Sequence, residues 1–328
     1  QMQVAFYSHL LGIVQEKEPI VAGLILWDGS QKEITLSKLK KEFDLAYEHI
    51  HKIHSGEKQQ PHFCSMCKEC GWRNECLAEM ESTGDISLVS GLGREHKTAF
   101  FEMGITHLKG LAQAAKGPDG MTDASFQEFK RQAESLVSHQ PIVFGKAVLP
   151  TDKKLLYFDI EGETALGVDY LLGVYTVEGG VGRYHGFFAD KPSDEEKMWK
   201  EFLVWIDAQE DICIVHYHHY EKTVLKRLRA KYGCPDKTYK KLTKGMVDLF
   251  SVIKKTVVFP TYSYSVKDAA KAVGFTWRSS KAGGAQSIFW YDEWLKKGDV
   301  STKQAILDYN EDDCRAMERL VLWLRENA

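Results

Sequence analysis

The sequence lacks a long apolar segment and a strong net charge, and each absence removes a class of function. No apolar run approaches the ~20 residues that a membrane-spanning helix needs. The net charge of −3 excludes a chain that is basic throughout, so any site for a polyanion must be a local patch. Residues 1–15 do not read as a secretory leader, and we expect a cytoplasmic protein. Because the chain begins with Gln1, we also expect a fragment of a longer protein.

A disulfide framework is absent as well. The chain has seven cysteines, an odd number, and four of them fall within the segment CSMCKECGWRNEC at Cys64, Cys67, Cys70 and Cys76. This C-x2-C-x2-C-x5-C spacing favours a metal site in a reducing compartment. Four thiolates suit either Zn²⁺ or an iron–sulfur cluster. The alternative, a set of buried reduced cysteines, gives no reason for the x2 spacing to occur twice.

The N-terminal part of the chain predicts a small mixed segment followed by helices. Apolar residues at helical spacing indicate a helix over residues 1–15, and VAGLILW and KEITL indicate two strands. Residues 37–54 predict an amphipathic helix capped by Ser37. Residues 87–115 predict two helices around Gly104, within a helix-hairpin-helix-like connector over residues 81–150.

From residue 151 to 328 the pattern becomes that of a mixed α/β domain. Three strands with short turns, KLLYFDIEG, DYLLGVYTVEG and VGRYHGFFA, predict an antiparallel meander. A helix over residues 193–209, a fourth strand (DICIVHY), another helix and a last helix from Ser301 follow. This order predicts a ribonuclease-H-like fold with a mixed sheet flanked by helices.

Three segments of this domain carry acids at informative places. Asp159 and Glu161 share one face of a strand, because residues i and i+2 of a strand point the same way. Glu221 lies in the first turn of a helix, where a carboxylate is favoured. Tyr309 and Asp313 are four apart and share a helix face. Each feature alone also fits an ordinary solvated acid; together they favour a site for hard cations such as Mg²⁺.

Asp-x-Glu on a strand, an acid at a strand-to-helix junction and Tyr-x-x-x-Asp on a late helix occur in this order. The pattern resembles the DEDD 3′–5′ exonucleases, in the subclass with Tyr in the last motif. The resemblance implies that Asp159, Glu161, Glu221 and Asp313 ligate two Mg²⁺ or Mn²⁺ ions, and that Tyr309 orients the attacking water. Glu221 departs from the Asp usual in that family; a related branch of predicted nucleases accepts either acid.

Substrate contacts are expected on two further segments. SYSVKDAAKAVGFTWR resembles the same branch, and Tyr264 and Lys267 are candidates for contacting a phosphate, although both also fit a helix start packed on the core. The stretch from residue 222 to 244 is the densest basic region. Its Lys222, Lys226 and Arg229 are candidates for following a nucleic-acid backbone, with a solvated helix face as the alternative.

The first 80 residues resemble the end of another nuclease domain. Gln3 and Tyr7 form Q-x-x-x-Y on a helix, and Cys67, Cys70 and Cys76 form C-x2-C-x5-C, as in RecB-like PD-(D/E)XK nucleases with an iron–sulfur cluster. The resemblance implies a [4Fe–4S] cluster, with zinc as the alternative and Cys64 as a local fourth ligand. It also implies that residues 1–80 are the C-terminal part of such a domain, whose catalytic acids would precede residue 1.

The leading hypothesis is therefore a metal-dependent 3′–5′ exonuclease that hydrolyses single-stranded nucleic acid by a two-metal-ion mechanism, with DNA as the favoured assignment of its substrate and RNA as the alternative. The first alternative is a non-catalytic nucleic-acid-binding module that serves a helicase, as partner or fused domain. The second is an iron–sulfur or zinc scaffold within a DNA repair or defence complex. Retention of all four acids argues against the first alternative, because a decayed site would be expected to lose one.

Overall fold

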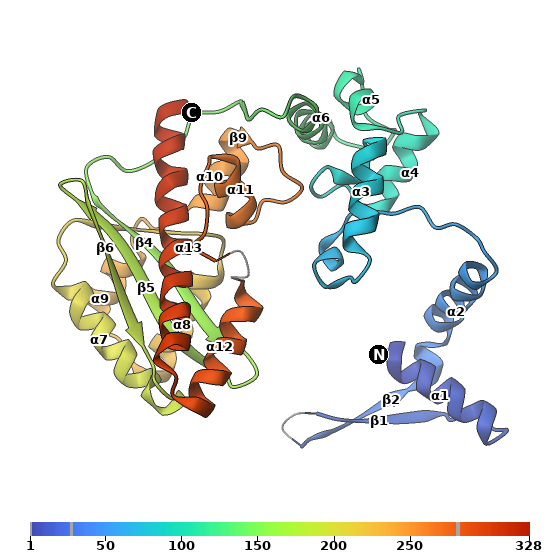
Figure 1. Cartoon of the computed structure of the whole chain (residues 1–328), viewed down its shortest axis with the longest axis horizontal. Coiled ribbons are helices and arrows are strands. Elements are labelled where there is room, and N and C mark those ends of the chain that lie inside the picture. The colour runs from blue at the N-terminus through green and yellow to red at the C-terminus, as the bar shows by residue number, and fades with distance from the viewer. Residues whose placement is uncertain (1, 27–28, 280–282) are drawn as a thin grey trace. The chain divides into compact units, whose positions relative to one another are not determined.

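The computed structural model describes residues 2–26, 29–279 and 283–328. Its contacts divide the chain into two compact units, Gln1–Pro61 and His62–Ala328 (Figure 1). Within the described residues, no helix is both long enough and apolar enough to cross a membrane. The two units are treated separately below.

The first unit is small. It contains α1 (Met2–Val14), the antiparallel pair β1 (Val21–Ile25) and β2 (Gln31–Thr35), and α2 (Lys40–His54). Among its described residues, the core cluster consists of four buried side chains, Ala5, Ile34, Leu39 and Phe43. The predicted cap at Ser37 is wrong: Leu36–Lys38 form a 3₁₀ turn, and α2 begins after Leu39 without a side-chain cap.

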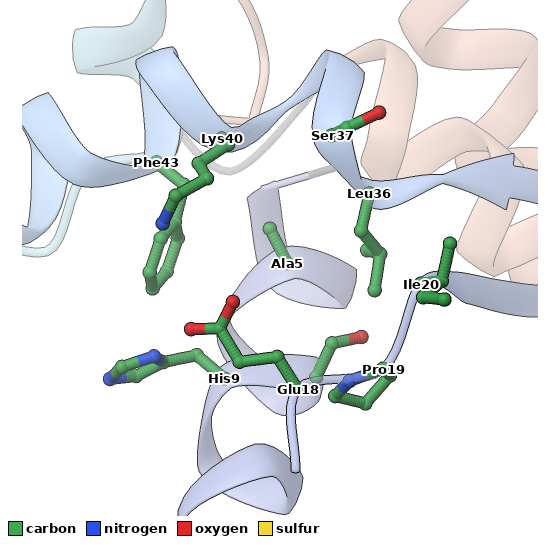
Figure 2. Close-up of a pocket in the computed structure, with 10 residues that line it drawn as sticks. Ala5, His9, Glu18, Pro19, Ile20, Leu36, Ser37, Lys40 and Phe43 are labelled. Atoms are coloured by element: carbon green, nitrogen blue, oxygen red, sulfur yellow. The ribbon is translucent and has the colours of Figure 1, made fainter.

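A hollow of about 230 Å³ lies in this unit between α1, the segment before β1 and the start of α2. Figure 2 shows Lys40 and His9 at the left of the view, Glu18 below and Leu36 at the right, with Ala5 between them. The polar groups that line this hollow are of mixed charge, so it presents no single-signed surface to a ligand.

The second unit begins with helices. After a 3₁₀ turn at Ser65–Glu69 come α3 (Arg73–Thr83), a 3₁₀ turn at Ile86–Leu88, α4 (Arg94–Glu102), α5 (Leu108–Gln113) and α6 (Asp123–Ser138). As predicted, α4 and α5 flank Gly104, whose φ of +78° suits glycine. Met80 of α3 packs into the same core as Leu111 and Phe126. The expected boundary between residues 80 and 81 thus falls inside a helix, and the assignment of residues 1–80 to a RecB-like domain stays a prediction.

The α/β domain has the predicted mixed sheet. Its five strands run in the order β6 (Val181–Phe188), β5 (Val168–Glu178), β4 (Lys154–Glu163), β7 (Ile212–His216) and β8 (Val247–Asp248). The first three are antiparallel, whereas β4, β7 and β8 are parallel. The sequence predicted all but the two-residue β8. A separate antiparallel pair joins β3 (Ile142–Val143) to β9 (Val257–Val258).

Helices cover both faces of this sheet and divide its core. They are α7 (Glu195–Asp207), α8 (Tyr220–Tyr232), α9 (Asp236–Thr243), α10 (Leu249–Thr256), α11 (Val266–Ala272), α12 (Gly284–Lys297) and α13 (Val300–Asn327). Leu156 and Phe158 of β4 pack with residues of α7 and α8, whereas Leu155 and Tyr157 pack with residues of α10, α11 and α13. Strand alternation therefore turns the next odd-numbered residues, Asp159 and Glu161, toward the α13 face.

A substitution of Phe202 in α7 tests the packing of the core that contains Leu156 and Phe158. It is fully buried and stacks on Phe158, with ring centres 5.4 Å apart. Phe202→Ala is expected to lower the free energy of unfolding by about 3–5 kcal/mol, because it removes buried apolar surface and leaves a cavity. Urea unfolding monitored by tryptophan fluorescence measures this. Val204→Ala, on the exposed face of the same helix, should change stability by less than about 0.5 kcal/mol; equal losses would contradict this packing.

Candidate metal centre

Three carboxylates meet where β4 passes α13. One oxygen each of Asp159, Glu161 and Asp313 lies within 4.8 Å of the other two. Glu161 and Asp313 are buried, and Asp159 is partly buried. The β4–β5 register shifts between Glu161 and Gly162, so the strand is irregular where the acids converge. The fold thus brings together three of the predicted site residues, Asp159, Glu161 and Asp313, although Glu161 and Asp313 are 152 positions apart in the sequence.

The acids disfavour one another's ionisation. Burial, then the charges of Asp313, Glu161 and Glu221, raise the pKa of Asp159 well above its usual range. Burial and the Asp313 charge raise the pKa of Glu161 to about 8. Burial also raises the pKa of Asp313 to about 6, against the opposing hydrogen bond from Trp277. Such a cluster binds protons tightly when it holds no cation, and its hard oxygen donors fit a divalent cation.

Neutral donors hold two of these acids in place. Asn310 of α13 is fully buried; its Nδ2 donates to Asp159 Oδ2 at 2.7 Å, and its Oδ1 accepts from the Tyr184 hydroxyl at 2.8 Å. Trp277 Nε1 donates to Asp313 Oδ1 at 2.6 Å. Only glycine fits opposite Asn310, because a Cβ on Gly173 would lie 1.5 Å from the amide oxygen. The sequence analysis did not identify Asn310 as a residue that supports Asp159. In the sequence, the contact is marked only by a glycine in one strand and an amide among the polar residues of a helix.

Tyr309 and Lys267 lie beside the carboxylates, as the sequence predicted for a site residue and a substrate contact. Lys267 Nζ is 4.7 Å from the centre of the Tyr309 ring. Burial, then the charge of Asp313, raise the pKa of the Tyr309 hydroxyl above its usual range, so the phenol stays protonated. Burial lowers the pKa of Lys267, while the charges of Asp313 and Glu161 oppose this. Lys267 thus brings a cation to a cluster of acids.

Glu221 approaches the cluster but does not join its 4.8 Å group. Its Oε2 lies 3.3 Å from Nδ1 of the buried His216, the last residue of β7. Among the described residues, neither ring nitrogen of His216 nor Oε2 of Glu221 has a hydrogen-bond partner. Buried polar atoms without partners call for an explanation such as an ion or a water. Together with its effect on Asp159, this orphaned oxygen is what a fourth ligand would present.

The comparison with known families agrees with this geometry. A sequence model of the RNase H superfamily matches residues 156–325, which is more than half of the chain. The chain belongs to the RNase H superfamily. No curated protein and no solved structure matched it. Membership indicates a nuclease-type activity with nucleic acid as substrate, and it makes divalent metal at Asp159, Glu161 and Asp313 the expected cofactor.

Three other acids of α13 bind an arginine instead of joining the cluster. The Arg278 guanidinium bonds to Asp312 at 2.9 Å and to Glu311 at 3.0 Å, and it also reaches Asp308. Because Asp312 is buried, it needs this partner. Arg278 thereby ties the segment after α11 to α13, next to the Trp277 that holds Asp313.

The other predicted substrate contacts have mixed outcomes. Lys222 and Lys226 are exposed on α8, whereas Arg229 pairs with Asp236 at 2.6 Å and stacks on Tyr239. Tyr264 donates its hydroxyl to Gln132 of α6 at 2.8 Å, so it joins the helical part to the RNase H domain as a packing residue. The basic run is thus partly neutralised within the fold, and the substrate roles of these residues stay predictions.

The cysteine cluster lies in the second unit, on the turn before α3 and on α3 itself. Cys64 donates its N–H to Cys67 Sγ at 3.4 Å. Burial, then the charges of Cys70 and Cys67, raise the pKa of Cys76. In the part of the chain that the structure describes, one set of three metal-capable side chains has its ligand atoms within 4.8 Å of one another. That set is Asp159, Glu161 and Asp313, and it contains no cysteine. Nothing in the geometry supports an iron–sulfur cluster or zinc there, and both stay predictions.

Asn310→Ala tests the support of Asp159. Without the amide, Asp159 loses a donor that orients it, so the affinity for Mn²⁺ is expected to fall by about 10–100-fold. Isothermal titration calorimetry of metal-stripped protein measures this. Asn327→Ala, exposed near the end of the same helix, is the matched control and should bind like the wild type. Unchanged affinity in Asn310→Ala would show that Asp159 needs no such support.

The raised pKa of Glu161 predicts how stability depends on pH without metal. The folded state holds this proton between pH values of 4.5 and about 8, where the unfolded chain has lost it, so folding weakens as pH rises through this window. In EDTA, Glu161→Gln should therefore unfold at a higher temperature than the wild type, by a margin that grows with pH. Each kcal/mol regained corresponds to about 2–4 °C. A margin independent of pH in differential scanning calorimetry would contradict the assignment.

Proposed function

We propose that the chain is a divalent-metal-dependent 3′–5′ exonuclease that acts on single-stranded nucleic acid, with DNA as the favoured substrate and RNA as the alternative. The observation that carries the proposal is the meeting of Asp159, Glu161 and Asp313 within 4.8 Å, inside a domain of the RNase H superfamily. Their pKa values are raised, which is expected for acids arranged around a missing positive charge.

The arrangement of the acids favours a site for two cations over a group of ordinary solvated acids. Asp159, Glu161 and Asp313 would supply most of the ligands, and the unpartnered oxygen of Glu221 would complete the set from the side of α8. When bound there, two Mg²⁺ or Mn²⁺ ions would supply the positive charge that stabilises the attacking and the leaving oxygen of an in-line displacement. Glu221 is longer than the Asp usual in the DEDD pattern, and its position against His216 keeps its oxygen at the rim of the cluster.

The chain's own residues position the reactants. Tyr309 keeps its proton at neutral pH and lies one helical turn before Asp313, so its hydroxyl is suited to orient a water near the carboxylates. The Lys267 ammonium lies beside the same acids and is suited to bind a phosphate oxygen. Asn310 and Trp277 hold Asp159 and Asp313 in fixed orientations, so the ligands are ordered before substrate arrives.

Polarity and the requirement for a free 3′ end rest on the resemblance to the DEDD exonucleases with Tyr in the last motif. The supporting feature is the pair Tyr309 and Asp313 on one face of α13, with Tyr309 buried next to the acids. The test includes both DNA and RNA, and so decides between the two polymers.

A degradation assay tests the proposal. Strands of DNA and of RNA labelled at the 5′ end are incubated with Mg²⁺, Mn²⁺ or EDTA, and the products are resolved by length. We expect metal-dependent ladders that shorten from the 3′ end. Asp313→Asn should lower the rate by more than about 100-fold, because even partners outside the ligand shell contribute about 10–100-fold. Glu326→Gln, an exposed acid on the same helix, should behave as wild type.

Three results would contradict the proposal in different ways. Internal cuts in a strand with a blocked 3′ end would indicate an endonuclease. Cleavage that persists in EDTA or in Asp313→Asn would exclude the carboxylate site as its source. Binding of strands without any cleavage would favour the non-catalytic nucleic-acid-binding module.

A further inference from the structure

A second site of distinct chemistry lies at the outer edge of the sheet. A hollow of about 400 Å³ beside β8 is lined by three lysines from segments far apart in the sequence. Lys146 follows β3, Lys222 lies at the start of α8, and Lys255 lies near the end of α10. We call this the lysine hollow. Apart from these three lysines its lining is Val148, Met246, Val247, Asp248, Ser251, Val252 and Thr256.

The lysine hollow carries positive charge that the fold does not neutralise. All three lysines are exposed, and among the ion pairs of the described residues none involves Lys146, Lys222 or Lys255. This contrasts with Arg227, Arg229 and Lys231 of α8, each of which is paired with an acid. Three cations around one depression repel one another, so a bound anion would stabilise them.

The one acid in the lining does not offset these lysines by contact. Asp248 Oδ1 accepts from the backbone N–H groups of His218 and Phe250, at 2.9 and 3.1 Å, and its Oδ2 accepts from the Ser251 hydroxyl at 2.6 Å. Asp248 therefore caps α10 and holds the loop that precedes α8. Counting charges, the three lysines exceed this carboxylate by two.

The hollow lies close to the carboxylate cluster. In the sheet, β4 neighbours β7 and β7 neighbours β8, and all three are parallel. With strands about 4.8 Å apart, β8 lies about 10 Å from β4, level with the residues that directly precede Asp159. Ligands of such sheets bind outside the carboxyl ends of parallel strands. Lys222 makes the connection locally, because it follows Glu221, whose side chain is buried toward the cluster.

Exposed rings lie next to the lysine hollow, on a loop whose His218 N–H bonds to Asp248 of the lining. His218 and His219 lie on the loop from β7 to α8, with ring centres 4.3 Å apart, and the His218 ring is 4.7 Å from that of Phe250. His218 has a φ of +69°, a conformation that non-glycine residues rarely adopt, and its N–H is held by Asp248. Flat rings beside a positive groove are the usual combination for holding a single strand, because every base can stack.

We propose that the lysine hollow binds backbone phosphates of the substrate strand, a few nucleotides from the end that lies at the carboxylate cluster, with His218 and His219 as stacking surfaces between them. The proposal rests on the proposed function, since the strand it describes is the one being cleaved. It adds Lys146 and Lys255, which no sequence motif singles out, and it gives Lys222 a defined place.

The binding experiment uses the full chain in EDTA, where no metal-dependent cleavage occurs. Fluorescence anisotropy measures the affinity for a labelled homopolymer of about 15 nucleotides at several salt concentrations. The test variant is Lys146→Gln, Lys222→Gln and Lys255→Gln together. We expect its affinity to fall by about tenfold or more at low salt, and the slope of log affinity against log salt to decrease by about 2.

A control variant makes the same change of charge elsewhere. It carries Lys191→Gln, Lys237→Gln and Lys240→Gln, three exposed lysines outside the hollow. It should keep wild-type affinity and salt slope. If the two triple variants bind equally well, or if the wild type does not bind the homopolymer, the lysine hollow is not a strand-binding site.

A cleavage arm separates this proposal from the proposed function. With Mn²⁺, the test variant should have a raised KM for the long strand and an unchanged rate on a dinucleotide, which is too short to span both places. Equal losses on both substrates would place the lysines in the reaction itself and overturn the proposal. If the wild type cleaves neither substrate, the proposed function fails, and the anisotropy result alone decides the lysine hollow.

Discussion

Mutual repulsion among Asp159, Glu161 and Asp313 is the constraint around which the RNase H domain is organised. Three acids within 4.8 Å cannot all ionise away from water without a compensating charge. Burial adds to the cost, and the pKa values of all three rise. The fold holds this unfavourable arrangement because β4 and α13 are anchored by extensive apolar cores on either side of the sheet. Stability elsewhere thereby maintains a site that is ready for cations.

The groups around the acids reduce that repulsion without removing it. Asn310 and Trp277 donate neutral hydrogen bonds, and Lys267 contributes a nearby positive charge. None of them neutralises the cluster as Arg278 neutralises Asp312 on the neighbouring face of α13. The same helix thus carries one acid whose partner is built into the fold and another, Asp313, that belongs to the cluster. This difference separates a structural ion pair from a candidate metal site.

The basic residues on the surface also divide into those that have an acid partner and those that have none. The sequence of α8 suggests one continuous positive face. In the structure, however, Arg227, Arg229 and Lys231 each form an ion pair with a nearby acid. Three of the lysines without an acid partner, Lys146, Lys222 and Lys255, come from separate segments and meet at the edge of β8. Sequence density of charge therefore does not show which of these cations stay unpaired, because ion pairing depends on which acids the fold brings close.

Local patterns were sufficient for the mixed sheet and for the acids on it. Strand alternation placed Asp159 and Glu161 on one face, and helical spacing placed Tyr309 with Asp313, because both periodicities are properties of the backbone alone. The cap at Ser37 and the strand β8 were beyond such reasoning, since a 3₁₀ turn and a two-residue pairing are decided by their surroundings. Only the tertiary structure brought Asn310 against Gly173 and assembled the lysine hollow. It also left Oε2 of Glu221 buried near His216 without a hydrogen-bond partner. Those features depend on distances between segments remote in sequence, which no periodicity encodes.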